Sequence, residues 1–161
     1  MSEDRIEKSV VIRAPRDRVW KALTDSQEFG RWFGAKFEGP FVPGRTVRGA
    51  IAPSEVATPE ETTSNPYLGK PLLIQVERIE PPRRFSYRWQ PLESSPDLEV
   101  VEDPSTLVEF ILEETKDGTR LTVVETGFSQ IPATHRKSAY ESHEGGWGIQ
   151  VQRVRVHIEQ G

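Results

Sequence analysis

Short runs of strand character separated by turn residues occupy most of the chain. Residues 84–90 (RFSYRWQ) alternate between aromatic and polar, so Tyr87 and Trp89 share one strand face, which we expect to point inward. An Asp-Gly pair at 117–118 lies between two such runs and predicts a hairpin. Further strands are predicted at residues 6–13, 36–38, 46–51, 73–79, 106–114 and 120–126. The pattern therefore predicts a chain rich in β-strands.

Helical spacing follows the first predicted strand. Pro15 ends that strand and suits the first turn of a helix. Thr24 and Asp25 either end this helix or cap a second short one. The apolar residues at helical spacing are Val19, Trp20, Ala22 and Leu23 in the first helix and Phe29, Trp32 and Phe33 in the second.

The last segment, residues 135–161, fits two periodicities. Residues 154–158 (VRVHI) alternate as a strand would, and glycines at 145, 146 and 148 count against a helix. A helical stripe is formed by Trp147, Val151, Val154 and Ile158. Propensity alone leaves this segment open between helix and strand.

A segment of different character interrupts the strands. Residues 52–71 (APSEVATPEETTSNPYLGKP) hold four prolines with many Ser, Thr and Glu residues and little apolar content. They predict an exposed loop that reaches to about residue 72. Because loops longer than about 12–15 residues are uncommon, a loop of this length is usually functional or mobile.

Composition limits the size and the location of the protein. A chain of 161 residues fits a single domain spanning 1–161, and 4 Trp, 3 Tyr and 7 Phe supply large side chains for one core. The absence of cysteine excludes disulfides, thiolate nucleophiles and Cys-based zinc sites. Neither a signal-peptide core nor a stretch of about 20 apolar residues is present, so we expect a cytoplasmic protein without a membrane span.

Charge argues against one class of partner. The net charge is −4, and no run of Lys or Arg exceeds two residues. Because nucleic-acid binders carry a basic patch or stripe, DNA and RNA are not expected partners.

Four blocks of sequence then point to a known family. They are VIRAPRDRVWKALTDSQEFGRW (11–32), IEPPRRFSYRW (79–89), DGTRLTVVETGF (117–128) and HEGGWGIQVQRV (143–154). Together, and in this order, they resemble the Aha1-like (activator of Hsp90 ATPase homologue) branch of the START-like, or SRPBCC, superfamily.

The resemblance implies an α+β, helix-grip fold. Its curved antiparallel sheet of about six to seven strands surrounds a long C-terminal helix, here expected at about 136–159, and two short helices follow the first strand. The family also implies a cavity beneath the helix. This sequence departs from the family in its longer loop at 52–71 and in the valines of its tail. It also lacks the second domain of the eukaryotic co-chaperone, so Hsp90 activation is not carried over with the resemblance.

Aromatic side chains are the candidates for lining such a cavity, although ordinary core packing would place the same residue types there. They are Trp32, Phe33, Phe37, Tyr87, Trp89, Phe110, Tyr140 and Trp147, joined by Val151 on the helix stripe.

Two polar residues are further candidates for contact with a ligand. Glu125 shares the strand parity of Leu121 and Val123, so it either points inward as a polar anchor or lies at a rim open to water. His143 either lies at the mouth of the cavity, where it could bind a ligand or transfer protons, or is a surface or capping histidine. His157, in the last turn of the expected helix, suits the helix dipole without any further role.

The sequence favours a binding module over an enzyme. It holds no nucleophile elbow, HExxH motif or P-loop, and we predict no catalytic residue, cofactor or metal. The leading hypothesis is a carrier or sensor of a hydrophobic small molecule, as a monomer or homodimer. The alternatives are a co-chaperone-like domain with an Hsp90-type partner, and a cyclase- or hydrolase-like enzyme in which Glu125 or His143 acts as acid or base.

Overall fold

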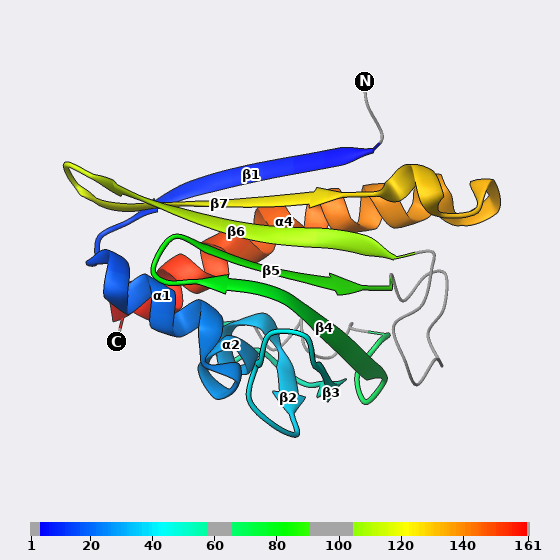
Figure 1. The fold of residues 1–161 in the computed structure, drawn as a ribbon, viewed down its shortest axis with the longest axis horizontal. Coiled ribbons are helices and arrows are strands. Elements are labelled where there is room, and N and C mark those ends of the chain that lie inside the picture. Colours follow the sequence, from blue (N-terminus) through cyan, green and yellow to red (C-terminus); the bar gives the residue numbers. More distant parts are fainter. Residues whose placement is uncertain (1–3, 58–65, 91–104, 161) are drawn as a thin grey trace.

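The computed structural model of the protein describes residues 4–57, 66–90 and 105–160, so residues 58–65 of the predicted loop lie outside the described residues. The fold is α+β, as predicted (Figure 1). The elements are β1 (Arg5–Ile12), α1 (Arg16–Thr24), α2 (Ser26–Phe33), β2 (Ala35–Phe37), β3 (Thr46–Ile51), β4 (Pro71–Glu80), β5 (Arg84–Trp89), β6 (Thr106–Thr115), β7 (Gly118–Thr126), the 3₁₀ turn η1 (Phe128–Gln130) and α4 (Ala133–Gln160).

The seven strands form one curved antiparallel sheet in the order β1-β7-β6-β5-β4-β3-β2. Apart from the first strand, which joins the edge beside β7, the order follows the chain. The predicted hairpin is confirmed, because Thr115 pairs with Gly118 and the two residues between them form the turn. Figure 1 shows α4 running along one face of the sheet, behind β5 and β6 in this view.

The two short helices are confirmed, and a single residue separates them. The Asp25 carboxylate accepts hydrogen bonds from the backbone N–H groups of Gln27 at 3.0 Å and Glu28 at 3.1 Å, so it caps α2. Gly34 ends α2 in the left-handed conformation, with φ of 99°. The Asp25 cap and Gly34 therefore determine where α2 begins and ends, at one end of the core.

The C-terminal segment is a helix of 28 residues, which resolves the ambiguity left by its propensity. The predicted stripe is buried against the rest of the molecule: Trp147, Val151, Val154 and Ile158. Near its end, His157 Nε2 lies 2.9 Å from the Glu28 carboxylate, which also pairs with Arg18. A partly buried network of charged side chains therefore fastens the end of α4 to the two short helices.

The loop predicted to reach about residue 72 ends earlier. β4 begins at Pro71, and Leu72 is a buried strand residue. At the other end of the loop, Ser54 is buried and its hydroxyl donates to the Trp32 carbonyl oxygen at 2.7 Å. The start of this segment is thus tied to α2, whereas the prediction made all of it exposed.

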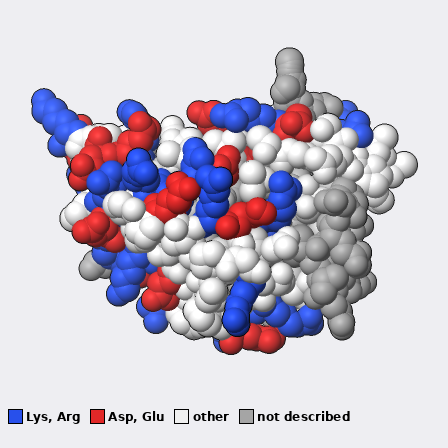
Figure 2. Space-filling view, viewed as in Figure 1, with Lys and Arg blue, Asp and Glu red and all other residues white. Residues whose placement is uncertain are grey.

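The outer surface carries charges of both signs. Figure 2 shows Lys and Arg side chains interleaved with Asp and Glu on the face turned toward the viewer. Across the outer face of the sheet, Arg84 pairs with Glu109 at 3.7 Å and Arg88 with Glu77 at 3.5 Å. Among the described residues, no helix has the length and apolar character needed to cross a membrane.

Candidate functional site

Glu125 is a fully buried carboxylate in the last strand. β7 alternates Leu121, Val123 and Glu125 on the face that meets α4, and all three side chains have 0% exposure. Glu125 lies between Val108 of β6 and Ile6 of β1 in the sheet. The prediction that it points inward therefore agrees with the structure, and the rim position open to water does not.

Four side-chain donors from three elements converge on this carboxylate. Trp147 Nε1 of α4 donates to Oε1 at 2.8 Å, and His143 Nδ1, one turn earlier, lies 2.8 Å from the same oxygen. On the opposite side, Trp89 Nε1 of β5 and Thr106 Oγ1 of β6 donate to Oε2 at 2.9 and 2.6 Å. A carboxylate offers about four lone-pair sites, so Glu125 is saturated as an acceptor.

These contacts keep Glu125 ionised in the protein interior. Burial favours the neutral acid and by itself raises the carboxyl pKa. The charge and hydrogen bond of His143, with the hydrogen bonds of Thr106 and Trp89, outweigh burial and lower the pKa of Glu125 below its ordinary value. Because an ionised carboxylate can only accept, His143 must carry its hydrogen on Nδ1.

Aromatic rings from the sheet, α2 and α4 gather beside the carboxylate. We name Phe33, Tyr87, Trp89, Phe110 and Trp147 the aromatic cluster. The indoles of Trp89 and Trp147 stack with centroids 5.9 Å apart and planes at 24°, while Phe110 meets Trp147 edge-on at 5.7 Å. Phe33 contacts both indoles. By holding both indole N–H groups, Glu125 fixes the orientation of the two largest rings.

Tyr87 is the polar member of the aromatic cluster on the sheet side. It is fully buried, and its hydroxyl finds no hydrogen-bond partner among the described residues. Burial raises the pKa of the Tyr87 hydroxyl well above its ordinary value, and the charge of Glu125 raises it further. The phenol is therefore protonated at any physiological pH and available as a donor.

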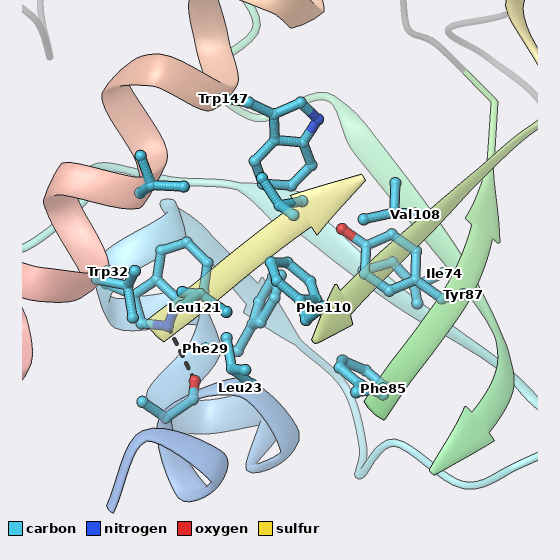
Figure 3. Close-up of a cluster of buried hydrophobic side chains, with 14 of the residues drawn as sticks. Leu23, Phe29, Trp32, Ile74, Phe85, Tyr87, Val108, Phe110, Leu121 and Trp147 are labelled. Carbon is cyan, nitrogen blue, oxygen red and sulfur yellow. Dashed lines mark hydrogen bonds between the residues drawn. The ribbon is translucent and has the colours of Figure 1, made fainter. Parts of the chain in front are cut away.

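The other predicted candidates lie around this cluster in different settings. Trp32 is buried, and Figure 3 shows its indole N–H bonded to the Ala22 carbonyl oxygen, at 2.9 Å. Phe37 packs against Phe29 near α2, away from the carboxylate. Val151 continues the buried stripe of α4.

Tyr140 belongs to a separate contact. Its hydroxyl donates to the Arg5 carbonyl oxygen at 3.1 Å, and its ring packs against Phe128. This side chain ties α4 to β1. His143 is half-buried on the same helix and touches the rings of Trp89 and Phe128.

Sequence reasoning missed two contributors to the site. Thr106 supplies one of the four donors, and a signal for it existed: the hairpin register puts Val108 opposite Glu125, and Thr106 lies two residues away on the same strand face. Phe29 of α2 contacts both Tyr87 and Phe110. Within the part of the chain that the structure describes, no three His, Asp or Glu side chains converge as metal ligands would.

The architecture defines the class of the protein. A curved seven-stranded antiparallel sheet around a long C-terminal helix, with two short helices after the first strand, is the helix-grip fold of the START-like (SRPBCC) proteins. The sequence model of the family described as "Activator of Hsp90 ATPase homolog 1-like protein" matches residues 13–159, so the chain belongs to that family. The family predicted from the four sequence blocks is confirmed.

Solved structures from other proteins share this fold. DynU16, a protein in the dynemicin biosynthetic locus, is 25% identical with a TM-score of 0.70; the match covers 98% of this chain and 48% of DynU16, so the chain spans about half its length. MLL2253 of Mesorhizobium loti is 22% identical, with a TM-score of 0.70 and 97% of both chains covered. A protein from Arthrobacter aurescens is 16% identical, with a TM-score of 0.71 and coverage of 98% and 87%. No curated protein matches the sequence.

Proposed function

We propose that this protein binds a small hydrophobic molecule between its sheet and α4, at the aromatic cluster. The observation that carries the proposal is the saturated, fully buried Glu125, which holds Trp89 and Trp147 from opposite sides of the interface.

A buried charge is a poor way to stabilise a fold. Removing a carboxylate from water costs several kcal/mol, and apolar side chains of similar volume usually serve stability as well or better. Departures from an apolar core are expected where a site must hold a set geometry. Here the geometry is that of two tryptophans whose N–H groups are fixed while their ring faces meet other aromatic groups. A flat apolar ligand that separates the stacked indoles would meet two flat aromatic faces, to which it is suited.

The helix that covers the cluster carries glycines at the turn that holds Trp147. Trp147 lies between Gly146 and Gly148 in α4, with Gly145 one residue before. Glycine weakens a helix interior by about 1 kcal/mol relative to alanine. The turn that carries Trp147 can therefore open at lower cost than the rest of the helix, which gives a ligand a way in.

What is known of the relatives supports a role in binding a small molecule. The family is START-like, a class that encloses ligands under its long helix, and DynU16 is encoded in a biosynthetic locus. This chain spans about half of DynU16, so its own ligand has to be identified directly.

Native mass spectrometry of the protein, purified without denaturation from the cells that make it, tests the proposal. We expect a bound species of small-molecule mass that is lost on denaturation. Trp147→Phe, which removes an indole N–H from the cluster, should lose that species. Trp20→Phe, a change of the same kind on α1 outside the cluster, should retain it. Bare protein mass, together with no response to any apolar compound in solution, would contradict the proposal.

A further inference from the structure

The Tyr87 hydroxyl is the starting point for identifying the class of ligand. Buried polar groups in folded proteins almost always have a partner, and an unpartnered one needs an explanation. Tyr87 is fully buried in β5, and its hydroxyl has no partner among the described residues. Figure 3 shows the hydroxyl directed away from β5, on the side of the ring that faces Trp147 and Phe110. The free donor thus points into the aromatic cluster and away from any backbone acceptor of its own strand.

The neighbouring carboxylate cannot satisfy this donor or bind a donor of the ligand. Both Glu125 oxygens already accept at least two hydrogen bonds each, from Trp147 and His143 on Oε1 and from Trp89 and Thr106 on Oε2, and His143 Nδ1 also lies 3.0 Å from Oε2. Among the described residues that face the cluster from the sheet, Tyr87 therefore carries the one side-chain donor that is still available. A ligand that bonds here has to bring an acceptor.

The charge that a ligand carries limits the class of ligand further. Glu125 is ionised, and its charge acts on Tyr87, whose pKa it raises. A ligand carboxylate placed at the Tyr87 hydroxyl would lose its hydration for a single hydrogen bond, because the charge of His143 is already paired with Glu125. Fatty acids and other carboxylates are thus disfavoured, although they are hydrophobic. The rings around Tyr87, with centroids 5.2 Å away for Trp89 and 6.1 Å for Phe110, favour a flat aromatic partner.

Resting on the function proposed above, we infer that the ligand is a neutral aromatic molecule whose carbonyl oxygen accepts a hydrogen bond from the Tyr87 hydroxyl. Its ring system packs against Trp89, Phe110 and Trp147, and it separates the two indoles, which are stacked at 5.9 Å in the protein without ligand. The carbonyl supplies an acceptor that the Tyr87 hydroxyl does not find among the described residues.

Three compounds of nearly equal size test this inference. 2-Acetonaphthone is a neutral aromatic ketone, 2-ethylnaphthalene lacks the acceptor, and 2-naphthoate carries a negative charge. Each is titrated into ¹⁵N-labelled protein while the indole N–H resonances of Trp89 and Trp147 are followed, since both groups border the site. We expect the ketone to bind about five- to tenfold tighter than the hydrocarbon, as one hydrogen bond predicts, and the naphthoate to bind more weakly than the ketone.

The variant Tyr87→Phe separates the hydrogen bond from ring packing. It should lower affinity for 2-acetonaphthone about five- to tenfold and leave affinity for 2-ethylnaphthalene unchanged. Its thermal midpoint should equal or exceed that of the natural protein, because it removes a buried donor without a partner and keeps the ring. Tyr140→Phe, whose hydroxyl bonds to the Arg5 carbonyl outside the cluster, is the control and should change neither affinity.

The outcomes distinguish this inference from the proposed function. If the naphthalenes bind but Tyr87→Phe does not reduce the preference for the ketone, the inferred hydrogen bond to a carbonyl is wrong. The proposed binding of a hydrophobic molecule at the aromatic cluster would still hold. The inference is also wrong if 2-naphthoate binds more tightly than the ketone. If none of the three compounds shifts the indole resonances, the proposed function itself fails at this site.

Discussion

At the scale of single residues, Glu125 sets the chemistry of the site because four donors depend on its two oxygens. In Glu125→Gln, one oxygen becomes an NH₂ group that cannot accept, so about two donors lose their partner. We expect the free energy of unfolding to fall by roughly 2–4 kcal/mol, since each unpaired buried group costs about 1–3 kcal/mol. Urea unfolding measures the loss.

Glu144→Gln is the matched control for this substitution. It removes the ion pair of Glu144 with Lys8 on the partly exposed side of α4. Such pairs contribute at most about 1 kcal/mol. Losses of equal, small size in the two variants would contradict a structural role for the buried carboxylate.

The free energy of unfolding at acidic pH gives a second test of the role of Glu125. Its pKa is lowered in the folded protein, against the opposing effect of burial, by His143 and the hydrogen-bond donors. The stability that this shift contributes is therefore complete above the unfolded carboxyl pKa of about 4.3 and is lost as the pH falls through the lower folded value.

We expect the free energy of unfolding to decline less steeply in Glu125→Gln than in the natural protein below about pH 4. Urea titrations at several acidic pH values measure both slopes. Asp4, whose pKa is lowered chiefly by hydrogen bonds from Ser129, contributes equally to both proteins and cancels in the comparison. Identical slopes would show that Glu125 does not titrate as described.

Residue patterns in the sequence predicted where Glu125 points but not what it binds. Strand alternation is local, so the inward direction follows from Leu121 and Val123 alone. The donors come from β5, β6 and α4, and their meeting depends on how distant segments pair. Of the four, only Thr106 is fixed by a short hairpin, and it alone could have been placed beside the carboxylate from the sequence.

At the scale of elements, α4 is a helix because its packing against the sheet outweighs the low helix propensity of its residues. Its glycines and β-branched valines made a helix uncertain from composition, yet the stripe from Trp147 to Ile158 buries one face along the sheet and stabilises the helix. The four sequence blocks resolved what propensity could not, because they carry information on the whole fold. The strand predictions needed no such help, since alternation and turn residues are local signals.

The glycines of α4 lead to a prediction about the same helix. A Cβ added at Gly146 would meet no atom of the described residues within 4 Å beyond its own helix neighbours. Gly146→Ala should therefore raise the free energy of unfolding by about 0.5–1 kcal/mol, measured by urea unfolding. If the glycines let the turn at Trp147 open, the same variant should bind 2-acetonaphthone more slowly in stopped-flow fluorescence.

Gly34→Ala is the contrasting control. Gly34 has φ of 99°, and a Cβ there would lie 2.8 Å from the Ala52 carbonyl oxygen, so this substitution should destabilise the protein. Stabilisation by Gly146→Ala without any slowing of binding would separate the helix energetics from ligand entry and would contradict the entry route.

At the scale of the whole molecule, the aromatic cluster is built by several elements together: the sheet, the short helix α2 and α4. The sheet presents Tyr87, Trp89 and Phe110 on its inner face, α2 adds Phe33, and α4 closes the cluster with Trp147. Contacts of His157 and Arg18 with Glu28 fasten the far end of α4, so the helix is held at a distance from the glycine-containing turn. The molecule thus combines a fixed frame with a turn of α4 that its glycines weaken.

The central claim concerns what occupies the interface between α4 and the sheet. A crystal structure of the protein with 2-acetonaphthone tests this claim most directly. We predict the naphthalene rings among Trp89, Phe110 and Trp147, with the ketone oxygen about 2.6–3.0 Å from the Tyr87 hydroxyl. Aromatic rings that keep their mutual contacts in the presence of the ketone, or a ketone bound elsewhere on the surface, would contradict it.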